Sequence, residues 1–327
     1  MPTYRVLVTS WAVEESNPDL DRLRAIGCDV INERRPKAHS EAEMRDLLPG
    51  VDAVIAASDR YTEPVFAVAD RLKIIARVGV GYDAIDLAAA TRHGVVVATT
   101  PGANHEAVAD LAFGLILGIA RYIPLHDRLI RAGQWERYTG VDVNGKTLGI
   151  LGMGKIGKGM ARRARGFSMR VVGHDPYWDE EFARANQVER LPLDEVIRVA
   201  DFLTLHLPAS PHTFKIMNAE RLRTMKPTAF LINTARGTLV DEPSLAQALQ
   251  EKWIAGAALD VFENEPPWGS AILACENTIF TPHVAGFSQV ANELSIRMSV
   301  DSIINVLSGK PPLDCVNPDV LKQAVQS

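Results

Sequence analysis

The sequence contains few of the features that mark secreted, membrane-spanning or nucleic-acid-binding proteins. It has only three cysteines, Cys28, Cys275 and Cys315, whose wide spacing matches neither a disulfide framework nor a CxxC metal site. No apolar run reaches the ~18 residues that a membrane span requires, and the N-terminal residues lack the pattern of a signal peptide. The formal net charge of −5 leaves no basic surface for nucleic acid. We therefore expect a cytoplasmic protein that binds no metal, membrane or nucleic acid.

The length and composition are those of a folded protein with more than one domain. At roughly 100–200 residues per domain, a chain of 327 residues predicts two domains. An apolar content of 47 % with 23 % charged residues is typical of globular chains and argues against disorder. The most apolar segment, residues 111–120, is too short for a membrane span and predicts a buried helix.

Short apolar runs alternate with helical patterns, which favours parallel sheets covered by helices on both faces. The first series predicts strands at residues 4–9, 29–32, 53–57, 73–78 and 95–100, with helices at 18–26, 40–49, 63–70 and 84–93. The second series predicts six strands at residues 147–152, 170–174, 202–207, 229–233, 254–261 and 278–280. Six strands in such an α/β pattern are typical of dinucleotide-binding sheets.

Two helical stretches lie outside these series, at residues 107–132 and 289–307. We expect the last helix to return to the first series, with chain crossings near residues 101–104 and 284–289, which contain the breakers Pro101-Gly102 and Gly286. The predicted fold is therefore α/β, with two doubly wound parallel sheets. A Rossmann domain of residues 102–286 is inserted in a flavodoxin-like domain of residues 1–101 and 287–327.

The second series opens with a strand that runs into GxGxxG, followed by a predicted helix at 158–167. On its own this motif fits an ordinary structural turn equally well. In this context Gly152 permits a tight turn, Gly154 lets the backbone approach a pyrophosphate, and Gly157 allows helix and strand to pack closely. The pyrophosphate would lie at the helix N-terminus, where free N–H groups and the helix dipole favour an anion.

The next strand ends in Asp175, eighteen residues after Gly157. This offset is close to the ~20 residues expected for the acid that binds the ribose 2′-OH. A carboxylate there repels a 2′-phosphate, so we predict that residues 102–286 bind NAD rather than NADP. The alternative is a solvated acid at a strand end, and His174 beside it is interpreted as a bystander.

Three further segments stand at predicted strand ends and contain Arg236, Glu265 and His283. Ligands of open α/β sheets bind beyond the carboxyl ends of strands, so these side chains could converge beside the cofactor. Hydride transfer from a 2-hydroxy acid needs a proton acceptor, a role that histidine suits, and arginine can bind a carboxylate. Asp260 could accept a hydrogen bond from the nicotinamide carboxamide. Taken singly, each residue could equally be structural.

The motifs GILGMGKIG, HLPASPHT, INTARG, LDVFENEP and TPHVAG occur in this order, together with the strand that ends at Asp175. Across about residues 50–318 the chain resembles the D-isomer-specific 2-hydroxyacid dehydrogenases. The resemblance implies that His283 is the acid/base, Glu265 its partner and Arg236 a substrate ligand. It implies NAD contacts at Lys155, Ile156, Asp175, His206, Pro208, Thr234, Ala235, Arg236, Asp260, His283 and Gly286.

The resemblance also implies a substrate site and a homodimer. The substrate carboxylate would bind backbone N–H groups in the loop of residues 78–81, through Val78, Gly79 and Val80. The domain of residues 1–101 and 287–327 would therefore be the substrate domain. Asn104 would line the active site. Family members are usually homodimers built around the helix near 107–122 and an arm near 133–135 that contains Trp135.

The sequence leaves two types of substrate open, a small 2-keto acid and a phosphorylated 2-hydroxy acid. The segments RVGVGYDAIDL and PGANHEAVADL are similar to phosphoglycerate dehydrogenases, but the usual phosphate-binding arginine is replaced by alanine near residue 56, unless Arg60 or Arg77 substitutes. We therefore hold glyoxylate or hydroxypyruvate and 3-phosphoglycerate as equal hypotheses. Glu265 argues against formate dehydrogenase, which typically has glutamine there. The alternative from another class is an NAD-sensing, corepressor-like binding protein on the same fold.

Overall fold

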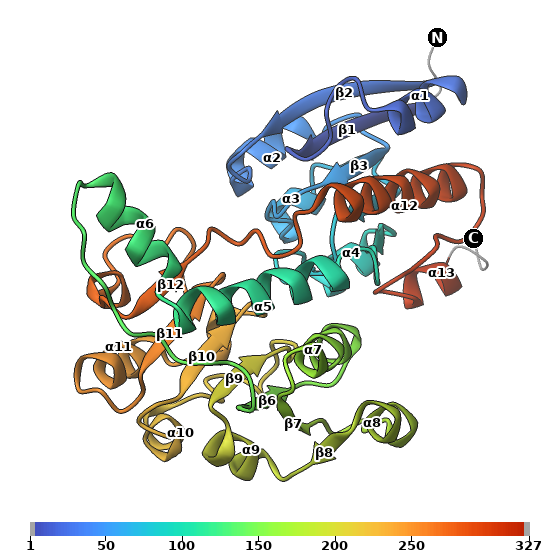
Figure 1. The fold of residues 1–327 in the computed structure, drawn as a ribbon. Coiled ribbons are helices and arrows are strands. Elements are labelled where there is room, and N and C mark those ends of the chain that lie inside the picture. The colour runs from blue at the N-terminus through green and yellow to red at the C-terminus, as the bar shows by residue number, and fades with distance from the viewer. Residues whose placement is uncertain (1–3, 324–327) are drawn as a thin grey trace. The chain divides into compact units, whose positions relative to one another are not determined.

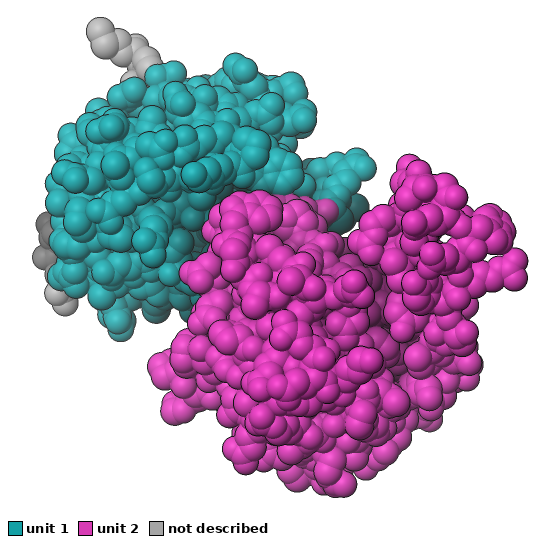
Figure 2. Space-filling view, turned by 90° about the vertical axis from the view of Figure 1, so that its left-hand side faces the viewer, with its two compact units in different colours: residues 1–104, 288–327 teal, residues 105–287 magenta. Residues whose placement is uncertain are grey.

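Two parallel sheets, each covered by helices, form the protein in a computed structural model that describes residues 4–323 (Figure 1). Contacts along the chain divide it into unit 1, residues 1–104 with 288–327, and unit 2, residues 105–287 (Figure 2). The predicted α/β fold class is confirmed. The chain crosses between units at 104/105 and 287/288, whereas the predicted domains meet at 101/102 and 286/287.

Unit 1 contains a five-stranded sheet in the order β2-β1-β3-β4-β5, which is the flavodoxin-like order. Its strands are β1 (Tyr4–Ser10), β2 (Cys28–Arg35), β3 (Ala53–Ala56), β4 (Ile74–Arg77) and β5 (Val96–Ala98). The strands β3 and β5 consist of fully buried apolar residues, as expected for a parallel sheet with both faces covered.

The helices of unit 1 come from both ends of the chain. They are α1 (Pro18–Ala25), α2 (Glu41–Leu47), α3 (Glu63–Phe66), α4 (Leu87–Arg92), α12 (Gln289–Leu307) and α13 (Asp319–Gln323). Helix α12 contacts α1, β3 and β4. Its buried residues Ile296, Val300 and Ile303 share one apolar core with Val6 and Val8 of β1. The prediction that the last helix returns to the first series is therefore confirmed.

Unit 2 contains a seven-stranded sheet in the order β12-β11-β10-β9-β6-β7-β8. The strands are β6 (Thr147–Leu151), β7 (Arg170–His174), β8 (Val188–Arg190), β9 (Phe202–Leu205), β10 (Phe230–Asn233), β11 (Gly256–Leu259) and β12 (Thr278–Phe280). The prediction of six strands was wrong, because it missed β8. This edge strand has three residues, two of them charged and exposed, and so shows no apolar run. With β8 included, six of the seven strands follow the dinucleotide-binding order.

The helices of unit 2 cover both faces of this sheet. They are α5 (His105–Ala120), α6 (Ile123–Arg131), α7 (Lys155–Gly166), α8 (Glu180–Asn186), α9 (Leu193–Val199), α10 (Ala219–Thr224) and α11 (Glu242–Gln250), with 3₁₀ turns η1 (Gly237–Leu239) and η2 (Ala271–Ala274). The stretch predicted as one helix at 107–132 is two helices, because Tyr122 has a φ of 53° and Pro124 cannot continue α5.

Helix α5 is largely buried, as predicted for residues 111–120, whereas α6 has no buried residue. In the described part of the chain, no single helix is long and apolar enough to cross a membrane. Only α5 and α6 taken together, with a bend of 64°, satisfy such a test of length and composition.

Candidate active site

The carboxyl ends of five neighbouring strands of unit 2 meet at one edge of the sheet. In the strand register Leu151 of β6 and Asn233 of β10 both pair with Leu205 of β9, and Leu259 of β11 pairs with Asn233 and with Phe280 of β12. The residues that follow these ends therefore lie side by side: Gly152, His206, Thr234, Asp260 and Thr281. The strand order reverses between β6 and β9, which is where ligands bind in such sheets.

The three glycines of the fingerprint have different surroundings. Gly152 has a φ of +97°, and a Cβ there would lie 2.5 Å from the carbonyl oxygen of His206. A Cβ on Gly157 would lie 2.1 Å from the Gly152 oxygen, so helix and strand pack closely here, as expected. A Cβ on Gly154 would meet no atom within 4 Å. The protein thus leaves the N-terminus of α7 uncovered at Gly154, as a bound pyrophosphate requires.

Helix α7 begins at Lys155, three residues earlier than predicted, directly after Gly154 as its N-cap. The predicted start at 158 was wrong because the glycines hide the helical pattern of the first turn. The correction places Lys155 and Ile156 in the first turn, where N–H groups lack helical partners and can bind an anion.

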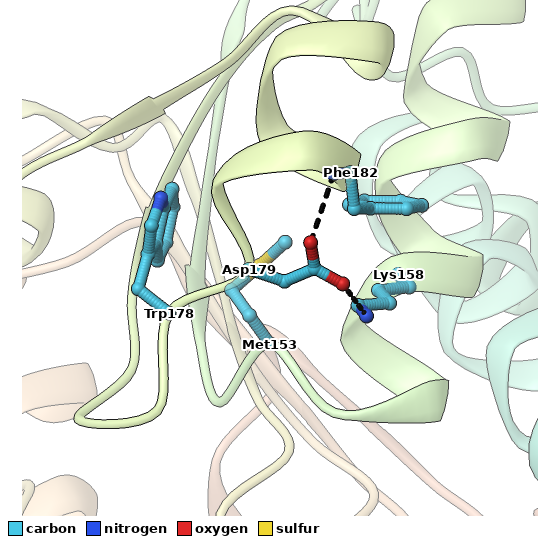
Figure 3. Close-up of a pocket in the computed structure, with 5 residues that line it drawn as sticks. All are labelled: Met153, Lys158, Trp178, Asp179 and Phe182. Atoms are coloured by element: carbon cyan, nitrogen blue, oxygen red, sulfur yellow. Dashed lines mark hydrogen bonds and ion pairs between the residues drawn. The ribbon is translucent and has the colours of Figure 1, made fainter.

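Asp175 follows β7 and faces the glycine loop. Its carboxylate accepts hydrogen bonds from the N–H groups of Met153, at 2.6 Å, and Tyr177, at 2.7 Å. Close by, Lys158 of α7 donates to Asp179 at 2.5 Å, and the Phe182 N–H donates to the same carboxylate (Figure 3). Two carboxylates of one short segment are therefore tied to the glycine loop and to α7. The bystander His174 faces Leu191, with 3.2 Å between Nδ1 and the carbonyl oxygen.

Two polar atoms at the sheet edge are buried without a hydrogen-bond partner in the described residues, His206 Nδ1 and Thr234 Oγ1. The other ring nitrogen of His206 lies 2.9 Å from Thr204 Oγ1, and burial lowers the pKa of His206 to about 3, so the ring is neutral. An unpartnered buried polar group costs roughly 1–3 kcal/mol. A bound dinucleotide with hydroxyl, amide and phosphate groups can partner both atoms, so this edge fits NAD.

The other residues predicted to contact the cofactor lie on the same edge. Pro208 follows β9, Ala235 and Arg236 follow β10, and Gly286 follows the segment after β12. The buried Asn233 shapes the second of these segments, because its Oδ1 accepts from the Ala235 N–H at 3.0 Å and its Nδ2 donates to the Arg236 carbonyl at 2.8 Å. The sequence patterns did not predict this role of Asn233, although a polar residue at the end of a buried strand is a usable signal.

His283 and Glu265 form a close pair, with 2.7 Å between His283 Nδ1 and Glu265 Oε2. The second oxygen of Glu265 accepts from the Phe262 N–H at 3.1 Å. Burial raises the pKa of Glu265, but His283, the Phe262 N–H and the charge of Arg236 outweigh it, so that the pKa ends below its ordinary value. The glutamate therefore stays charged, orients the imidazole and leaves Nε2 for proton transfer.

Asp260 is fully buried and organises the segment that carries His283. Its carboxylate accepts from Thr281 Oγ1 at 2.5 Å and from the N–H groups of Val284 and Ala285, both at 2.9 Å. Burial raises the pKa of Asp260, although these hydrogen bonds oppose the shift. The predicted contact of Asp260 with the nicotinamide carboxamide stays a prediction.

Four of the five predicted substrate residues lie in unit 1, and the fifth, Arg236, lies in unit 2. Val78, Gly79 and Val80 follow β4, and Asn104 is half-buried directly before α5. The Val78 N–H donates to the Ala56 carbonyl and the Gly79 N–H to Thr100 Oγ1, both at 3.0 Å. Among the described residues, only the Val80 and Gly81 N–H groups of this loop lack a protein acceptor.

The sheet edge with its glycine loop, carboxylate and His–Glu pair can be compared with known proteins. Residues 113–285, more than half of the chain, match the family model described as "D-isomer specific 2-hydroxyacid dehydrogenase, NAD binding domain". The chain belongs to this family of dehydrogenases. It is therefore an NAD(P)-dependent enzyme of this family, and the matched NAD-binding domain lies within unit 2.

Named relatives of this dehydrogenase cover most of its length. A glyoxylate reductase from Pyrococcus horikoshii is 41 % identical over 282 residues, covering 83 % of this chain and 84 % of the relative. A D-3-phosphoglycerate dehydrogenase from Methanocaldococcus jannaschii is 38 % identical over 85 % of this chain but 54 % of the relative. The crystal structure of the TT0316 protein from Thermus thermophilus is similar with a TM-score of 0.88 at 37 % identity, covering 95 % of this chain and 99 % of that one. The corepressor-like alternative gains no support from these relatives.

Proposed function

We propose that this dehydrogenase reduces a small 2-keto acid of the glyoxylate or hydroxypyruvate type to the D-2-hydroxy acid with NADH. The observation that carries the proposal is the pair of His283 and Glu265, 2.7 Å apart, on the sheet edge that also carries the glycine loop. The identity of 41 % with a glyoxylate reductase supports this substrate class.

The side chains of unit 2 supply the proton and the orientation that this reaction needs. Bound NADH supplies the hydride for the carbonyl carbon. His283 Nε2 donates its proton to the carbonyl oxygen, so that a C=O group becomes a CH–OH group, and Glu265 stabilises the imidazolium before transfer. Arg236 binds the substrate through its planar guanidinium, which matches the geometry of a carboxylate.

We assign the substrate carboxylate to the loop after β4 in unit 1. The unpartnered N–H groups of Val80 and Gly81 can donate to it, while Val78 and Gly79 shape the loop through bonds to the protein. Asn104 is assigned to the same substrate site by the family resemblance. This loop role and the roles of Arg236 and Asp260 are parts of the proposal.

A phosphorylated substrate is the second candidate, because a guanidinium lies beside the same loop. Arg77 donates through Nη2 to Ser58 Oγ at 3.1 Å, and its Nη1 lies 3.0 Å from the position of a Cβ on Gly79. A cation there would favour a keto acid with a second negative group. The identity of 38 % with a D-3-phosphoglycerate dehydrogenase supports this alternative.

The test is the oxidation of NADH by the purified protein with glyoxylate, hydroxypyruvate, phosphohydroxypyruvate and pyruvate in parallel. We expect glyoxylate or hydroxypyruvate to give the highest kcat/KM, and NADPH to be a poorer donor. Turnover of phosphohydroxypyruvate alone would select the second candidate. Tight binding of NADH without turnover of any acid would overturn the proposed function.

We further propose a homodimer, with α6 and the arm that follows it as the interface. Ile123 and Ile130 of α6 are 55 % and 54 % exposed, and Trp135 of the arm is 77 % exposed. A second copy of the chain would bury this apolar surface, and large exposed apolar patches are typical of interfaces. We also propose a cytoplasmic enzyme, since Cys28, Cys275 and Cys315 are all free thiols.

A further inference from the structure

The loop that follows β4 contains a glycine held by a threonine outside the loop. Gly79 has a φ of +135°, which side chains other than glycine rarely adopt. Its N–H donates to Thr100 Oγ1 at 3.0 Å, and the Thr100 N–H donates back to the Gly79 carbonyl, also at 3.0 Å. Thr100 follows β5 and is 1 % exposed, so water does not compete for its hydroxyl. Two hydrogen bonds thus join one glycine to one buried residue.

Arg77 confines Gly79 from another direction. Its Nη1 donates to the Val78 carbonyl at 2.5 Å, and the same atom lies 3.0 Å from the position that a Cβ on Gly79 would take. The Val78 N–H is bonded to the Ala56 carbonyl at 3.0 Å. The backbone before Gly79 is therefore held in place. The N–H groups of Val80 and Gly81 come directly after Gly79, whose backbone conformation is rare. Their direction depends on what holds Gly79 there.

We propose that Thr100 is a positioning residue for substrate binding. Its hydroxyl keeps Gly79 in the left-handed region, so that the N–H groups of Val80 and Gly81 stay aligned to receive the substrate carboxylate. This inference rests on the proposed function, in which that loop binds the carboxylate. Without the hydroxyl, the loop populates other conformations. The apparent affinity for the keto acid is then the intrinsic affinity multiplied by the fraction of molecules whose loop is aligned.

The matched pair Thr100→Val and Thr99→Val tests this role. Thr99 is the preceding residue, is 4 % exposed and gives its hydroxyl to Asp314 at 2.6 Å, away from the substrate loop. We expect Thr100→Val to raise the KM for the keto acid about tenfold, as the loss of one hydrogen bond predicts. Its kcat should change less than about threefold, with the KM for NADH unchanged, because binding of the carboxylate is weakened equally in the ground state and in the transition state.

Two further variants separate positioning from general stability. Thr100→Ser keeps the hydroxyl and should restore the keto-acid KM to within about twofold of wild type, a rescue that a packing role would not give. If Thr100→Val does not fold, as judged by circular dichroism, Thr100→Ala and Thr99→Ala are compared instead. The Thr100 variant is again expected to raise the keto-acid KM more than the Thr99 variant does.

The inference is overturned if the Thr100 and Thr99 variants shift the keto-acid KM equally, or if Thr100→Ser is as impaired as Thr100→Val. Both of these outcomes leave the proposed function intact, because wild type still turns over the keto acid. A wild-type protein that reduces none of the four acids would overturn the proposed function and this inference together.

Discussion

His283 lies in a backbone region that non-glycine residues rarely occupy, with a φ of 53°. Its N–H donates to the Asp260 carbonyl at 2.8 Å, and the Asp260 carboxylate bonds the residues on either side of it. Such strain persists only where the surroundings fix it, and it is concentrated at functional sites. The buried aspartate and the Glu265 carboxylate together determine where the imidazole points.

Replacing His283 with alanine should lower kcat for keto-acid reduction by roughly 10²–10⁴, the range for a positioned acid or base. A second histidine provides a control, because His93 Nε2 also lies 2.7 Å from a glutamate, Glu63. His93→Ala should leave steady-state turnover unchanged. A loss below about fivefold in His283→Ala would remove His283 from the acid/base role.

Replacing Glu265 with glutamine should shift the alkaline limb of the pH–rate profile for reduction to lower pH. The pKa of Glu265 is lowered, so the carboxylate is charged over the working range and favours the protonated imidazole. A neutral glutamine removes that charge, so the loss of activity on the alkaline side should begin at a lower pH. Profiles of kcat/KM against pH check this, with Glu63→Gln as the control. Superimposable profiles would exclude the pairing.

Replacing Asp175 with alanine should reduce the preference for NADH over NADPH by about tenfold or more, since a charged hydrogen bond contributes roughly 1.5–3 kcal/mol. The carboxylate already accepts from Met153 and Tyr177, which places it at the glycine loop for a ribose hydroxyl. The ratio of kcat/KM for the two cofactors measures the effect. An unchanged ratio would count against the ribose role, whatever happens to stability.

At the scale of elements, two glycines of the turn between β6 and α7 have different roles, Gly154 in cofactor binding and Gly157 in folding. A Cβ at Gly157 would overlap the Gly152 oxygen at 2.1 Å, whereas a Cβ at Gly154 meets no protein atom within 4 Å. We therefore expect Gly157→Ala to lower the free energy of unfolding by roughly 2–4 kcal/mol.

Gly154→Ala should instead unfold like wild type but bind NADH about tenfold more weakly, because its methyl group occupies the space for the pyrophosphate. Gly166→Ala, at the end of α7 and equally open, is the control for both measurements. Urea unfolding and NADH titration distinguish the variants. Wild-type NADH affinity in Gly154→Ala would show that the cofactor does not approach this backbone.

The elements that sequence analysis located are those with continuous apolar runs. Strand β7 was predicted to the residue, because a buried parallel strand needs such a run. The half-buried strand β12 was also predicted to the residue. The short strand β8 and the break at Tyr122 were missed, since neither has an apolar signature of its own. A local sequence pattern does not reveal that Tyr122 adopts a left-handed conformation. It therefore does not show that α5 ends at Ala120 and that α6 begins at Ile123.

The sequence predicted the motif residues of the candidate site, but it did not predict the hydrogen bonds that hold them in place. Arg236, Glu265 and His283 were identified from strand ends, and the structure brings Glu265 and His283 into contact. The bonds of Asn233 to its turn and of Thr100 to Gly79 were not foreseen. Such contacts depend on the spacing of strands and on side-chain rotamers, which a sequence pattern does not encode.

At the scale of the whole molecule, the exposed apolar face of α6 predicts association of two copies. Replacing Ile123 and Ile130 with aspartate should shift the mass in sedimentation from about twice 35.8 kDa to that of one chain. Phe214 is 56 % exposed elsewhere in unit 2, and Phe214→Asp should leave the mass unchanged. A wild-type protein that sediments as a monomer would refute the dimer.

The core of unit 1 is assembled from the two ends of the chain. Asn317 accepts from the Val97 N–H at 2.8 Å and donates to the Val95 carbonyl at 2.9 Å, so a segment after α12 completes the edge of β5. During translation, unit 2 emerges between the two parts of unit 1, and at ~5–20 residues per second its synthesis takes about 10–40 s. For that time β1 to β5 are outside the ribosome without α12. The first part of the enzyme to be made therefore cannot complete its core until α12 and the segment after it have been synthesised.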